Sequence, residues 1–130
     1  MEIQPQTQGL LKRLAELLAR QRVAMRTLHG RGGLAARTMT PIEMDAAGAI
    51  WFITANDTLP RPAAGEELPV NLVFANAADG DYVSIAGVAD IFDAAGRKQA
   101  LWTLAARPWF SGPDDPRLAL LKVTPHHVEI

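Results

Sequence analysis

Few side chains in this sequence could carry out chemistry by themselves. It has three histidines and no cysteine, and its serines are Ser84 and Ser111. Neighbouring strand residues point to opposite faces, so His126 and His127 cannot chelate one metal ion together, and His29 stands far from them in the sequence. Neither serine lies in a Gly-x-Ser-x-Gly elbow, and the lack of cysteine excludes thiolate chemistry. We therefore expect no metal site and no nucleophilic side chain.

The carboxylate pairs and the glycine-rich segment are typical of turns. Asp79 and Asp81 flank a glycine, and Asp114 and Asp115 stand between two prolines. Aspartate next to glycine or proline favours tight turns over paired acid-base or calcium sites. Residues 30–33 contain three glycines but no following Lys-Ser or Lys-Thr, so they predict a hairpin and not a phosphate loop.

Composition and charge predict one globular domain covering residues 1–130. The chain is 48% hydrophobic and 21% charged, with a net charge of -1. This balance favours a folded core and supplies no general field for nucleic acid or an anionic membrane. No apolar run approaches the roughly 20 residues of a membrane-spanning helix, and residues 1–8 are polar. We expect a cytoplasmic protein.

Two helices are expected, one near each end of the chain. The first lies within residues 1–22, where leucines recur at the spacing of one helical face, at Leu10, Leu11, Leu14, Leu17 and Leu18. This face could pack on the rest of the chain or on a partner subunit, and periodicity does not choose between them. The second helix is expected over residues 98–107, because Pro108 would end it.

Between the helices, short β-compatible segments alternate with turn signals. They predict strands over residues 23–28, 35–44, 49–54, 70–75, 82–92 and 119–124. The fifth is long enough to bend at Gly87. Strands that follow one another without crossover helices form antiparallel sheets, and small sheets commonly curl to remove their edges. The expected fold is mainly β, a six-stranded antiparallel barrel over residues 23–130 with flanking helices.

Six segments match a known pattern in the same order. They are Val23-Ala-Met-Arg-Thr-Leu28, Ala36-Arg-Thr-Met39, Ile50-Trp-Phe-Ile-Thr54, Val70-Asn-Leu-Val-Phe74, Tyr82-Val-Ser-Ile-Ala-Gly-Val-Ala89 and Trp109-Phe-Ser-Gly-Pro-Asp-Asp-Pro116. Together they resemble the pyridoxamine 5'-phosphate oxidase-like split barrels, in their bacterial general stress protein branch. The resemblance implies a homodimer of six-stranded split barrels with FMN bound at the subunit interface.

The same resemblance implies contacts to FMN from two strands. Arg37 matches the arginine of an Arg-Pro-Met motif that contacts the phosphate, although Thr38 replaces the proline. Thr38 and Met39 would follow the flavin ring along that strand. Ile53 and Thr54 match a Phe-Thr pair whose backbone and hydroxyl meet the flavin.

Three further contacts are implied in loops. Thr58 falls at a serine position of the family, and Trp109 matches a tryptophan that approaches the flavin near the dimer seam. Two residues after Thr58 the family has a phosphate-binding lysine, and here Pro60 stands in its place. Arg61 follows directly and could supply the missing charge.

The resemblance and its departures leave three functions open. The first is an FMN-dependent oxidoreductase of unknown substrate, for which flavin supplies the redox chemistry and the protein needs no acid or base of its own. The second is a non-catalytic dimeric binding protein on the same scaffold, with weakened or lost FMN binding because of Pro60. The third is a protein that holds haem, a deazaflavin or a pyridoxal species in the same cleft.

Overall fold

The protein is mainly β, as expected from its sequence. The computed structural model describes residues 9, 12–16, 23–30, 32–39, 41–56, 59, 68–76, 78–92, 95–102 and 110–129. The strands are β1 (Ala24–Gly30), β2 (Gly33–Met39), β3 (Pro41–Met44), β4 (Ile50–Ala55), β5 (Leu68–Asn76), β6 (Asp81–Phe92) and β7 (Leu118–Glu129). One helix, α2 (Ala95–Leu101), lies between β6 and β7 in the sequence.

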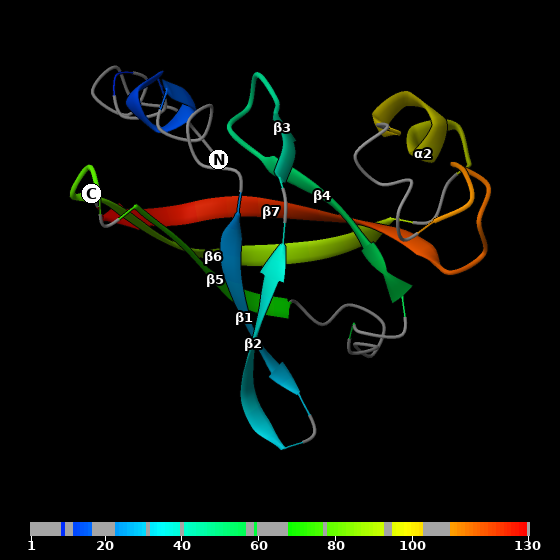
Figure 1. Ribbon diagram of the computed structural model, residues 1–130, viewed down its shortest axis with the longest axis horizontal. Helices are drawn as coiled ribbons and strands as arrows, with labels where there is room; N and C mark the ends of the chain where they lie inside the picture. Colours follow the sequence, from blue (N-terminus) through cyan, green and yellow to red (C-terminus); the bar gives the residue numbers. More distant parts are fainter. Residues whose placement is uncertain are drawn as a thin grey trace.

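All seven strands belong to one antiparallel sheet in the order β2-β1-β5-β6-β7-β4-β3. The strands β2 and β3 are consecutive in sequence, with only Thr40 between them, yet they occupy the two ends of this order. Because a step from Met39 to Pro41 spans no more than about 7 Å, the two ends of the sheet must approach each other there. The sheet is therefore a curled, incomplete barrel, split between β2 and β3 (Figure 1).

The strand count differs from the expected six because the predicted strand over residues 35–44 is two strands. They end and begin on either side of Thr40, where the chain passes from one edge of the sheet to the other. Continuous β-compatible sequence does not reveal such a change of partner strand, because both halves have strand propensity. The other predicted strands are confirmed, and β7 runs five residues past its predicted end at Thr124, to Glu129.

The inner face of the sheet carries the larger hydrophobic core. Its fully buried side chains include Phe52 from β4, Leu72 from β5, Ile85 from β6 and Leu121 from β7. Leu14 joins this core with 0% exposure, from a described helical segment over residues 12–16. The described segment of the expected amphipathic helix, residues 12–16, therefore packs on the barrel of its own chain through Leu14.

A second core covers the outer face of β4 and β7. Trp51 from β4 and Leu118 and Leu120 from β7 pack there with Leu101 of α2 and Phe110. Successive strand residues alternate between faces, so β4 and β7 are buried on both sides. This explains the unbroken apolar run Leu118-Ala-Leu-Leu121. The helix α2 begins three residues before the predicted start at Lys98, and residues 103–107 of that prediction lie outside the described residues.

Gly87 of β6, where the sequence predicted a bend, lies at an irregularity in the pairing of β6 with β7. The pairing of β6 with β7 shifts between Ala86 and Gly87, which lie opposite His127 and Pro125. A Cβ on Gly87 would overlap the backbone oxygen of Thr124 and lie 3.1 Å from the Cα of Pro125. The close approach of two backbones therefore requires glycine at this bulge.

Candidate functional site

The split of the barrel brings together the two strands on which the flavin contacts were predicted. Pro41 of β3 pairs with Phe52 of β4, and Met39 of β2 lies two residues before Pro41. Paired antiparallel residues have Cα atoms about 4.5–5.5 Å apart. The end of β2 and the second half of β4 therefore line the same opening, one on each side.

Three of the predicted site residues belong to the inner face at this opening. Met39 is buried in the inner core, and Arg37, two residues earlier on the same strand, is exposed on that face. Phe52 is also in the inner core, so Thr54, two residues later, belongs to the same face and is half-buried. Arg37 and Thr54 thus belong to the inner face of two strands that lie on either side of the split.

The structure directs two other predicted residues away from this face. Thr38 is exposed on the outer face, directly opposite Met25 of β1. The side chain of Ile53 packs against the outer core, beside Trp51 and its neighbours. For Ile53, only backbone atoms remain for a ligand in the split. The flavin contact of Thr38 stays a prediction and would have to be made from the outer face.

The remaining predicted contacts, Thr58, Arg61 and Trp109, lie outside the described residues. Next to Thr58 in the sequence, Leu59 is described and is buried in the inner core. Its backbone N–H donates to the carbonyl of Asn56 at 3.3 Å. Leu59 is thereby joined to Asn56 and packed against the barrel interior.

Sequence reasoning did not single out Arg26 of β1, which lies beside Arg37. It is 2% exposed and lies directly opposite Arg37 in the pairing of β1 with β2. Burial lowers the pKa of the Arg26 guanidinium below its usual value, and the charge of Arg37 lowers it further. The signal was available in the sequence, since the alternation of Ala24, Arg26 and Leu28 places a cation among inward-facing apolar positions.

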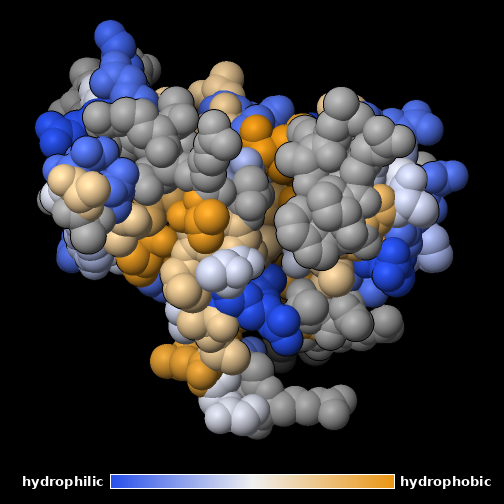
Figure 2. Space-filling view, in the orientation of Figure 1, coloured by the Kyte–Doolittle hydropathy of each residue, from blue (hydrophilic) through white to orange (hydrophobic). Residues whose placement is uncertain are grey.

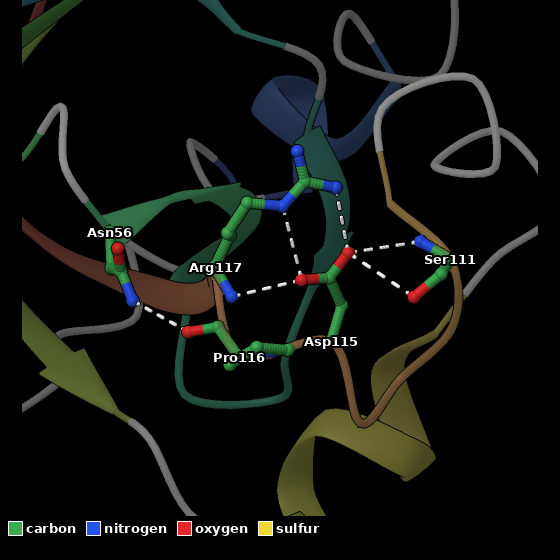
Figure 3. Close-up of polar contacts among 5 residues, drawn as sticks. All are labelled: Asn56, Ser111, Asp115, Pro116 and Arg117. Carbon is green, nitrogen blue, oxygen red and sulfur yellow. Dashed lines mark hydrogen bonds and ion pairs between the residues drawn. The ribbon is translucent and has the colours of Figure 1, made fainter.

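The aspartate pair after Trp109 organises a loop, as its turn context predicted. The carboxylate of Asp115 accepts hydrogen bonds from the backbone N–H groups of Ser111 and Arg117, and Arg117 Nη2 donates to it at 2.9 Å (Figure 3). The side chain of Arg117 and these backbone bonds hold the pKa of Asp115 well below its ordinary value. Asn56 Nδ2 donates to the carbonyl of Pro116 at 2.8 Å, which joins this loop to the end of β4.

A second aspartate fixes the turn between β3 and β4. Asp45 accepts from the backbone N–H groups of Ala47 and Ala49, and Trp51 Nε1 donates to it at 3.0 Å. Burial alone would raise the pKa of Asp45, but these hydrogen bonds and the charge of Lys122 lower it overall. Trp51 and Asp45 thus serve the outer core and the adjacent turn.

In the described parts of the chain, no three histidine or carboxylate side chains gather closely enough to hold a metal ion. Over the same residues, no helix is long and apolar enough to cross a membrane. His127 and Glu129 form an exposed pair on β7, with Nε2 and Oε1 3.2 Å apart. The split lined by Arg37, Met39 and Thr54 remains the candidate site.

Comparison with known proteins agrees with this architecture. The sequence profile described as "Pyridoxamine 5'-phosphate oxidase like" matches residues 10–130. General stress protein 26 of Bacillus subtilis (strain 168) is 37% identical over 49 residues, which are 38% of this chain and 35% of that protein.

Solved structures of general stress proteins have the same fold. The general stress FMN/FAD binding protein from the phytopathogen Xanthomonas citri is 30% identical with a TM-score of 0.77, covering 95% of this chain and 88% of that one. General Stress Protein 26 from Bacillus anthracis str. Sterne, at 18% identity, shares the fold with a TM-score of 0.72, covering 92% of both chains. Because the family profile matches residues 10–130 and the split, curled sheet agrees with it, this chain belongs to the pyridoxamine 5'-phosphate oxidase-like family.

Proposed function

We propose that this protein binds FMN in the split between β2 and the β3–β4 hairpin and acts as a flavin-dependent oxidoreductase. The observation that carries this proposal is the placement of Arg37 and Thr54 on the inner face at the two sides of one opening. The 30%-identical structure from Xanthomonas citri is described as an FMN/FAD binding protein, which supports the same ligand class.

The residues present suit the two ends of FMN. A phosphate monoester carries about -1.5 to -2 charges, and an arginine binds it through charge-assisted, bidentate hydrogen bonds. Arg37 offers an exposed guanidinium for this purpose. Thr54 offers a hydroxyl that can donate or accept at the polar edge of a flavin, and Met39 offers apolar surface beside it.

The chemistry of the reaction would come from the cofactor. Bound FMN would supply hydride or electron transfer, and no acid or base of this chain is required for it. The chain's own residues would bind and orient: Arg37 the phosphate, Thr54 the polar edge of the ring, and the inner core a wall that excludes water. Thr58, Arg61 and Trp109 remain proposed contacts on the strength of the family resemblance.

A titration of flavin-free protein with FMN, followed by quenching of flavin fluorescence, tests the role of Arg37. The variant Arg37→Ala should bind FMN about 10- to 100-fold more weakly, because it loses a charge-assisted contact of about 1.5–3 kcal/mol. Arg97→Ala is the matched control, since Arg97 is an exposed arginine of α2 on the outer core. Equal FMN affinity in the Arg37→Ala and Arg97→Ala variants would refute the assignment.

We also propose that the functional unit is a homodimer formed through the outer face of β1, β2, β5 and β6. Met25 of β1 is 41% exposed there, Leu34 of β2 76% and Tyr82 of β6 49%, and Met25 pairs with Val73 of β5. Hydrophobic surface also follows part of the projecting β1–β2 hairpin in Figure 2. A second copy of the chain would remove this surface from water.

Sedimentation equilibrium tests the dimer. The wild type should sediment as a dimer, and Met25→Glu should shift it to monomer because a charge would be buried in the interface. Ile91→Glu is the control, since Ile91 is 37% exposed and faces the other side of the sheet. A monomeric wild type at high micromolar concentration would contradict the dimer.

A further inference from the structure

We propose that Arg26 is the second cation of the phosphate subsite and does the work of the lysine that Pro60 replaces. This inference rests on the proposed binding of FMN. Arg26 and Arg37 are directly opposite each other in the β1–β2 pairing. Side chains of such a pair project from the same face of the sheet, with Cβ atoms about 4.5–5.5 Å apart. The two arginine side chains therefore start from adjacent points on one face, close enough for the charge of Arg37 to act on Arg26.

The two arginines differ in burial, so that Arg26 is the inner cation and Arg37 the outer one. Arg26 is 2% exposed, and its neighbours on the same face, Ala24 and Leu28, both belong to the inner core. On its other side Arg26 is opposite Leu72 of β5, which is 0% exposed. Arg37 is exposed on the edge strand. An anion would therefore reach Arg26 from the side of Arg37, at the split.

The electrostatics of this pair favour a doubly charged anion. Like charges directly opposite one another in a sheet destabilise it. Arginine keeps its charge in proteins even when buried, although burial and Arg37 both lower the pKa of Arg26. A phosphate monoester that reaches both guanidinium groups would gain two charge-assisted attractions, strengthened by the low dielectric around Arg26.

A hydrophilic patch lies beside the hairpin where the hairpin joins the body of the molecule (Figure 2). Part of the β1–β2 hairpin surface is hydrophobic in this view, so the hydrophilic patch is the polar surface beside it. The ligand class that fits the arginine pair is a phosphate monoester attached to a flat or apolar body. FMN meets that description, whereas riboflavin has the same ring without the phosphate.

The test compares the affinities of FMN and riboflavin for wild-type protein, Arg26→Met and Arg26→Lys. Methionine retains an apolar stem in the core, and lysine retains the charge without the bidentate fork. For Arg26→Met we expect FMN affinity to fall about 10- to 100-fold while riboflavin affinity changes less than about threefold. The FMN affinity of Arg26→Lys should lie between those of the wild type and Arg26→Met. Arg97→Met is the control and should retain the wild-type preference for FMN.

The possible outcomes separate this inference from the proposed function. If Arg37→Met loses the preference for FMN over riboflavin and Arg26→Met keeps it, the inference about Arg26 is wrong and Arg61 becomes the substitute to examine. If wild-type protein binds neither flavin, the proposed function fails, and inorganic phosphate becomes the probe. At constant ionic strength phosphate should then raise the Tm of the wild type but not of Arg26→Met or Arg37→Met. Equal shifts in all three proteins would overturn the anion subsite.

Should Arg26→Met fail to fold, Arg26→Lys carries the test. Its thermal unfolding shows whether the chain is folded, and its FMN-to-riboflavin affinity ratio then reports the phosphate contact alone. A ratio equal to that of the wild type would show that the guanidinium of Arg26 makes no specific contact with the phosphate.

Discussion

Replacing Gly87 by alanine should destabilise the barrel strongly, because β6 and β7 approach each other too closely for a side chain. The added Cβ would overlap the oxygen of Thr124 and lie 3.0 Å from its carbonyl carbon. Carbon–oxygen contacts between neighbouring strands normally measure about 3.3–3.6 Å, so the strands must separate locally. Overpacking costs about 1–3 kcal/mol, and each ladder hydrogen bond weakened nearby costs about 0.5–1.5 kcal/mol. We expect a total loss of about 2–4 kcal/mol.

Thermal unfolding followed by circular dichroism measures this loss. For a chain of this length about 1 kcal/mol corresponds to roughly 3–5 °C, so the Tm of Gly87→Ala should fall by about 6–20 °C. Gly96→Ala makes the same chemical change in α2, where nothing lies within 4 Å of the added Cβ. It should leave stability unchanged or raise it by up to about 1 kcal/mol, since alanine favours helix over glycine. Equal Tm values for Gly87→Ala and the wild type would refute the close approach of the two backbones.

Three further predictions concern the outer core and the carboxylates. Leu120→Ala should lower the free energy of unfolding in urea by about 2–5 kcal/mol, because Leu120 is 0% exposed; a loss below 1 kcal/mol would argue against a packed outer core. Arg97→Ala should lower the free energy of unfolding by about 0.5–1 kcal/mol in the same assay, because the guanidinium of Arg97 lies 4.7 Å from the Trp51 ring centroid. An unchanged free energy of unfolding would show that this contact does not stabilise the protein. The folded-state pKa of Asp115 is lowered, so its stabilisation is present above the unfolded pKa of about 3.9 and is lost as pH falls. Asp115→Asn should therefore lower Tm most near neutral pH, and a difference that stays constant down to pH 3 would contradict this.

The strands and turns were predictable because local signals were consistent with the final fold. Apolar alternation and turn residues predicted every strand except the break at Thr40. That break depends on how the sheet closes, which is a property of long-range pairing and not of local propensity. The doubly buried β7 was recognisable as a strand, but its apolar run did not reveal that α2 covers one face of it.

The candidate site was only partly predictable. The resemblance selected Arg37, Met39 and Thr54, and the structure brings these three to one face at the split. It could not reveal Arg26, because a family pattern transfers only the positions it contains. The alternation of β1 already indicated the inward placement of Arg26, but its pairing with Arg37 depends on the register of β1 against β2.

A titration of flavin-free wild-type protein with FMN, repeated at low and high ionic strength, tests whether the protein has a flavin site. Because the phosphate would be held by arginine charges that salt screens where they are exposed, we predict saturable binding that weakens as salt rises. In a sedimentation experiment on the same sample, the flavin absorbance that moves with the protein should correspond to one FMN per chain. No saturable binding up to about 1 mM FMN, where the free energy of association is only about -4 kcal/mol, would contradict the proposed flavin site.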